Sequence, residues 1–78
     1  MSFKTFEYSE IGIRGSITLD PTSVIDISIT RDTGTFKYTF LTITYKGDTE
    51  SIREIKFVDI DTAEKLRDEI LSSINEVI

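Results

Sequence analysis

The C-terminal part of the chain has the apolar spacing of an amphipathic helix. In DTAEKLRDEILSSINEVI, apolar residues recur at steps of three and four, which is the period of one helix face. The stripe consists of Ala63, Leu66, Ile70, Ile74 and Val77, with Leu71 and Ile78 at its margin. Asp61 is expected to be the N-cap, and Glu64, three residues later, completes a capping-box pair. The pattern predicts a helix over about residues 62–77.

The chain before this helix alternates apolar and polar residues, which predicts β-strands. The alternation is regular in IGIRGSITL and IDISIT, and Pro21 between them indicates a turn. The sequence predicts a single α+β domain over residues 1–78. Its strands, five or six within residues 3–58, form a curled antiparallel sheet in meander order, and the C-terminal helix packs on the sheet. The core is expected to contain Ile11, Ile13, Ile17, Leu19, Ile25, Ile27, Ile29, Ile55, Phe57, Leu66, Ile70 and Ile74.

One predicted strand, FKYTFLTITY, has apolar residues in two phases. Phe36, Tyr38 and Phe40 form one triplet, and the alternation then shifts by one residue at Phe40–Leu41. The second triplet consists of Leu41, Ile43 and Tyr45. A β-bulge at Phe40–Leu41 would return both triplets to one core. Without a bulge both faces of the strand are apolar, and the uncovered triplet is a binding surface for another protein or for a second copy of the chain.

The aromatic members of these triplets are the candidate partner-binding residues. They are Phe36, Tyr38, Phe40 and Tyr45. Aromatic side chains bring a large contact area at a low entropic cost, which favours them at protein interfaces.

The triplet Asp32-Thr33-Gly34 has the letters of an aspartic protease loop. The apolar residues that precede that motif in proteases are absent, because Thr30 and Arg31 stand there. The triplet lies between two alternating segments, where Arg31 to Gly34 is typical of a hairpin loop. We therefore interpret it as a turn.

The residue types present disfavour catalysis. The chain has no histidine and no cysteine, so the usual groups for acid–base and nucleophilic chemistry near neutral pH are missing. DIDTAEKLRDEI begins like a calcium loop, but its sixth and twelfth positions are Glu64 and Ile70 instead of glycine and glutamate. We expect no catalytic residue, no metal site and no cofactor.

Charge is unevenly distributed. Residues 1–46 carry five acidic and five basic side chains, whereas residues 47–78 carry nine acidic and four basic ones and account for the net charge of −5. An acidic surface repels phosphate backbones, which disfavours direct nucleic-acid binding. No apolar run exceeds two residues, so no membrane span is expected, and the lack of cysteine fits a cytoplasmic location.

The closing segment IREIKFVDIDTAEKLRDEIL resembles the end of pleckstrin-homology-like domains. It has a last alternating strand, a short acidic turn and a helix that opens with alanine and leucine three residues apart. The resemblance covers about twenty residues, and the chain is shorter than such domains. The resemblance implies a bent antiparallel sheet plugged by a helix and used to bind proteins. The lipid-binding version uses clustered basic residues in the first hairpin, where this chain has only Lys4 and Arg14.

Two functions are consistent with the sequence. The first is a non-enzymatic protein-binding module that acts through an exposed strand edge or an aromatic patch, because a domain without site chemistry acts through its surface. The alternative is a small acidic inhibitor of a nucleic-acid-binding enzyme, of the kind encoded by phage or mobile genetic elements. The charge in residues 47–78 suggests this alternative.

The turn interpretation predicts that Asp32→Asn leaves the melting temperature and any binding activity nearly unchanged. Asparagine accepts the same local hydrogen bonds in a turn as aspartate does. Thermal denaturation and a binding assay on both proteins provide the test. An intact fold with lost function would restore the catalytic interpretation.

Overall fold

A computed structural model describes residues 3–32, 34, 37–47 and 49–77 and shows an α+β architecture. The described part contains five strands, a short 3-10 helix and one α-helix. In chain order they are β1 (Lys4–Glu10), β2 (Ile13–Leu19), η1 (Pro21–Ser23), β3 (Val24–Arg31), β4 (Thr39–Lys46), β5 (Glu50–Phe57) and α1 (Ile60–Val77). The antiparallel strands, their meander order and the C-terminal helix packed on them confirm the predicted fold class.

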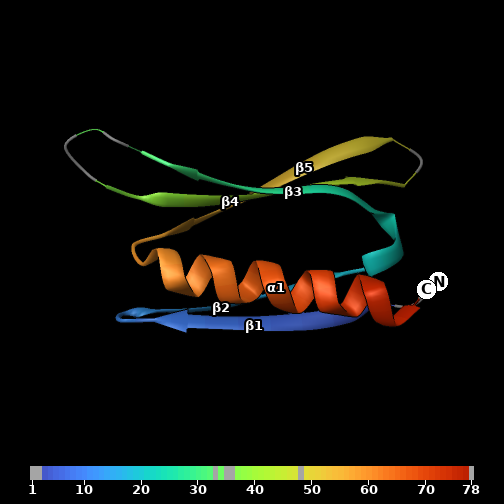
Figure 1. Cartoon of the computed structure of the whole chain (residues 1–78), viewed down its shortest axis with the longest axis horizontal. Coiled ribbons are helices and arrows are strands. Elements are labelled where there is room, and N and C mark those ends of the chain that lie inside the picture. Colours follow the sequence, from blue (N-terminus) through green and yellow to red (C-terminus); the bar gives the residue numbers. More distant parts are fainter. Residues whose placement is uncertain (1–2, 33, 35–36, 48, 78) are drawn as a thin grey trace.

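The strands divide into two sheets instead of the one continuous sheet that was predicted. Within the described residues, β1 pairs with β2, and β4 pairs with both β3 and β5. The link between β2 and β3 separates the sheets, because Pro21 and η1 turn the chain away from the β2 edge before β3 begins. Figure 1 shows α1 lying between the two sheets, with the chain ends at the same end of the molecule.

The core lies where α1 meets the inner faces of both sheets. Ala63 and Ile70 on α1 are completely buried, as are Leu41 and Ile43 on β4. The buried apolar cluster comprises Phe6, Ile17, Leu19, Leu41, Ile43, Phe57, Ala63, Leu66 and Ile70. One helix face therefore contributes to the core of both sheets.

The predicted core is partly correct. Its confirmed buried members are Ile17, Leu19, Phe57, Leu66 and Ile70, and its half-buried members are Ile27, Ile29, Ile55 and Ile74. The prediction omitted four buried residues, Phe6, Leu41, Ile43 and Ala63. Leu41 and Ile43 were omitted because the apolar triplet before them competed for the same face.

Two predicted core residues near the first turn are exposed instead. Ile11 is fully exposed and Ile13 is 39% exposed. Ile11 and Gly12 form the two-residue turn between β1 and β2, and Gly12 has a φ of 78°, which glycine adopts without strain. The alternation that starts at Ile11 thus includes a turn residue, which has no sheet face.

A third predicted core residue, Ile25, is 56% exposed. The register between β3 and β4 shifts between Val24 and Asp26, so Ile25 is the extra residue of a bulge. A bulge changes the side-chain phase by one residue, which explains why Ile27 and Ile29 pack on the core while Ile25 does not.

Tyr8 connects the two sheets. Its cross-strand partner on β2 is Gly15, and a Cβ at Gly15 would lie 2.5 Å from the Tyr8 hydroxyl oxygen. The ring therefore occupies the space of the missing side chain and meets Phe57 of β5 edge to face, with centroids 5.1 Å apart. Gly15 in the middle of β2 has no side chain, and this allows the contact.

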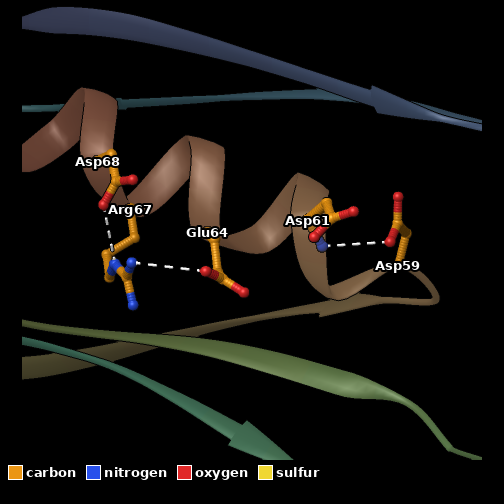
Figure 2. A network of polar contacts seen from close by, with 5 residues as sticks. All are labelled: Asp59, Asp61, Glu64, Arg67 and Asp68. Carbon is orange, nitrogen blue, oxygen red and sulfur yellow. Dashed lines mark hydrogen bonds and ion pairs between the residues drawn. The ribbon is translucent and has the colours of Figure 1, made fainter.

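The start of α1 is held by carboxylates from two elements. Glu10, at the end of β1, accepts hydrogen bonds from the backbone N–H groups of Val58 (2.8 Å) and Asp59 (2.9 Å). Asp59 in turn accepts a bond from the Asp61 N–H at 3.1 Å (Figure 2). Asp59 therefore caps the helix, and the prediction that Asp61 is the N-cap was wrong by two residues.

The segment with the protease-like triplet connects β3 to β4. Asp32 Oδ1 accepts a hydrogen bond from the Gly34 N–H at 2.9 Å, and the Asp32 N–H donates to the Tyr38 carbonyl at 2.9 Å. The carboxylate is thus part of a local turn. The next strand, β4, begins at Thr39, whereas the predicted strand began at residue 36.

Replacing Ile70 by aspartate is expected to unfold the domain. Ile70 is completely buried, and an unpaired carboxylate there costs several kcal/mol against a total stability of roughly 5 kcal/mol. Leu71→Asp is the matched control, because Leu71 is next in the chain and 39% exposed. Circular dichroism melts should show a cooperative transition for the control only. A wild-type-like melt of Ile70→Asp would mean that α1 does not hold the sheets.

Candidate functional site

The strand β4 has no bulge at Phe40–Leu41. Its pairing with β5 runs without a shift from Thr39 to Lys46, and its pairing with β3 is regular from Thr39 to Thr44. Of the two alternatives that the sequence leaves open, the structure shows the one without a bulge, in which Phe40 lies on the opposite face of β4 from Leu41, Ile43 and Tyr45. Leu41 and Ile43 face the core.

The two described residues of the first triplet, Tyr38 and Phe40, lie on the outer side of the three-stranded sheet. Phe40 stands directly opposite Lys56 of β5, and the Lys56 ammonium lies 4.4 Å from the centroid of the Tyr38 ring. Both rings are half-buried, and Phe36 lies outside the described residues. A cation over an exposed ring contributes about 0.5–1 kcal/mol and also covers the ring. Tyr38 and Phe40, which we call the outer patch, therefore offer a small apolar area.

Tyr45 lies apart from the outer patch, on the opposite face of β4. It is half-buried and packs against the edge of the core. It also lines a groove of about 500 Å³ between the two sheets. The candidate residues thus do not form one surface: Tyr38 and Phe40 face outward, and Tyr45 faces this groove.

The groove, which we call the inter-sheet groove, lies between the end of β2 and the start of β5. Its main lining side chains are Phe3, Ile17, Leu19, Tyr45, Ser51 and Arg53. Phe3 is 67% exposed, so an aromatic ring borders the opening. No lining residue in the described part of the chain comes from α1. The groove is where the helix leaves the inner faces uncovered.

Both strands that border the inter-sheet groove are edge strands. In the described residues, β2 pairs only with β1, and β5 pairs only with β4. Each therefore has backbone N–H and C=O groups on one side without a neighbouring strand, and such an edge can pair with a further extended segment.

One end of the inter-sheet groove is held in place by Asp20. The buried Asp20 carboxylate accepts hydrogen bonds from the Thr22 N–H at 3.1 Å and the Thr22 hydroxyl at 2.7 Å. The Asp20 carbonyl accepts one from the Ser23 N–H at 2.9 Å. These bonds fix the corner between β2 and β3, so the groove wall is preformed.

The acidic side of α1 is partly neutralised by its own arginine. Arg67 forms a contact of 3.1 Å with Asp68 and one of 3.9 Å with Glu64. Figure 2 shows Arg67 between these carboxylates, while Asp59 is used to cap the helix. Two of the nine carboxylates of residues 47–78 are thus in contact with a basic side chain.

Sequence reasoning had no signal for the inter-sheet groove. Tyr45 was identified as a candidate from its aromatic character, but Phe3, Leu19 and Arg53 were not. The groove depends on where the two sheets separate, which alternation within single strands does not encode.

Among the described residues, no group of three or more potential ligands lies close enough to hold a metal ion. None of the helices in the described part combines the length and the apolarity that a bilayer crossing requires.

The chain matches no family model, no curated protein and no solved structure. The similarity of its C-terminal segment to pleckstrin-homology-like domains therefore stays a prediction.

Proposed function

We propose that this protein is a non-enzymatic protein-binding module that binds an extended segment of its partner in the inter-sheet groove. The observation that carries the proposal is the position of this groove between two edge strands, β2 and β5. An added strand gains main-chain hydrogen bonds from an edge and places alternate side chains into the groove.

The side chains around the groove support this mode of binding. Tyr45 is half-buried and fixed against the core, so it can serve as an aromatic anchor without losing much entropy on binding. Phe3 at the opening exposes apolar area that a partner would remove from water. The edge of β3, in contrast, is interrupted by the bulge at Ile25, which opposes pairing there.

The composition supports a function without catalysis. The chain contains neither histidine nor cysteine, Asp59 caps α1, and Glu64 and Asp68 contact Arg67. A folded domain with this surface chemistry acts by recognition.

The second candidate, an acidic inhibitor of a nucleic-acid-binding enzyme, rests on the charge of residues 47–78. Their nine acidic side chains exceed the basic ones by five. Asp61 and Asp68 are exposed on α1, where they could face a basic surface. The contact between Asp68 and Arg67 weakens this candidate relative to the first.

Replacing Tyr45 by alanine should weaken partner binding by roughly tenfold or more, since truncation removes a central aromatic anchor. Immobilised protein captures partners from source lysate, and mass spectrometry identifies and quantifies them. The control is Tyr38→Ala on the outer patch, which should retain the partner. A partner lost only with Tyr38→Ala would move the site to the outer patch. If light scattering shows that this partner is a second copy, the chain is a homodimer.

Raising the salt concentration should leave binding in the inter-sheet groove largely intact. Going from about 0.1 M to about 1 M salt shortens the Debye length from roughly 10 Å to roughly 3 Å, which screens exposed charges but not apolar contacts or strand pairing. The measurement is the captured amount at both salt concentrations. A loss of binding by orders of magnitude would contradict the module and favour the acidic inhibitor.

A further inference from the structure

Arg53 is a cation on the inner face of an edge strand. On β5 it stands opposite Ile43 of β4, which is completely buried. Arg53 itself is exposed and lines the inter-sheet groove. Its guanidinium forms no hydrogen bond and no ion pair within the described residues, whereas Arg67 on α1 contacts two carboxylates. A guanidinium at this position is available to an incoming ligand.

The other charged side chain of the groove, Asp20, is engaged in the corner formed by η1. Its buried carboxylate accepts two hydrogen bonds from Thr22. The described lining residues thus carry one basic and one acidic side chain, and Arg53 is the exposed one of the two, because Asp20 is buried.

A strand that pairs with the open edge of β5 would place one of its side chains beside Arg53. Directly opposed side chains on neighbouring strands lie about 4.5–5.5 Å apart at Cβ, so a like charge there is unfavourable and a carboxylate is favourable. An apolar side chain would have to desolvate the guanidinium without giving it a partner. An inward-facing charge on an edge strand thus rejects most strands and admits one that carries the opposite charge.

We propose that the inter-sheet groove recognises an extended peptide segment with an alternating acidic and apolar face. The segment pairs with the open edge of β5 and places a carboxylate on Arg53, and apolar side chains two residues away contact Tyr45 and Leu19. The proposal rests on the proposed function and adds the chemistry of the partner. It also explains how an open edge remains specific, since Arg53 selects the partner by charge.

Three capped heptapeptides test the charge selection. They share the sequence Thr-Val-Thr-X-Thr-Val-Thr, where X is Glu, Gln or Lys, so the valines and X lie on one face of the strand. Each is titrated to about 1 mM into isotope-labelled protein, and amide shifts report affinity and location. The Glu peptide should shift the amides of β5 and β2 and bind roughly fivefold more tightly than the Lys peptide, as expected for one exposed ion pair.

Reversing the charge at Arg53 separates the charge preference of the groove from its general affinity for extended peptides. Arg53→Glu should reverse the preference, so that the Lys peptide binds more tightly than the Glu peptide. Lys56→Glu is the matched control, because it lies on the same strand with the same change of charge but on the outer face. It should leave the preference for the Glu peptide unchanged.

The outcomes separate this inference from the proposed function. Equal binding of the three peptides in the groove, or a preference that Arg53→Glu does not reverse, overturns the acidic partner and leaves the strand-binding module intact. Shifts confined to Tyr38, Phe40 and Lys56 overturn the groove as the site. No shift with any peptide overturns the inference, and the Tyr45→Ala capture experiment then decides separately whether the module itself stands.

Discussion

The packing of one helix face against two sheets is the interaction on which this structure depends. Leu66 and Ile70 on α1 lie in one buried cluster with Phe6 and Ile17 of one sheet and Leu41 of the other. A fully buried Leu, Ile or Phe side chain contributes about 1.5–3 kcal/mol of transfer free energy, and a domain of this size has little other apolar area to bury. Within the described residues no other layer covers the inner face of either sheet, so α1 holds the sheets together along with the contact of Tyr8 with Phe57.

The contacts that orient the start of α1 are polar, while its stability comes from burial. Glu10 of β1 and Asp59 before α1 together satisfy the first free N–H groups of the helix and the turn before it. Tyr8 and Phe57 join the two sheets at the same end of the molecule. The opposite end lacks such a connection in the described residues, and there the sheets separate to form the inter-sheet groove. The candidate site is thus a consequence of covering two sheets with one helix.

The outer faces of the sheets have a different role from the groove. On the β1–β2 sheet, Thr5 and Thr18 join their hydroxyls at 2.8 Å, and on the other sheet Lys56 covers Tyr38. Polar and charge-covered faces stay in water without an apolar partner. The proposed recognition through the groove uses the open backbone edges of β2 and β5, the Tyr45 ring and the Arg53 guanidinium.

The sequence by itself determined the helix, the alternation within the strands and the turn at Asp32, because each is encoded in the spacing of neighbouring residues. The period of Leu66 and Ile70 defines a helix face wherever the helix packs, and the Asp32 carboxylate bonds to the backbone of its own turn. Which strand faces are covered was decided by the tertiary structure. Alternation assigns Tyr38 and Tyr45 to opposite faces only once the absence of a bulge is known, and a single extra residue at Ile25 reverses the phase of its strand. The inter-sheet groove arises where two sheets separate, and this separation depends on contacts between residues far apart in the chain.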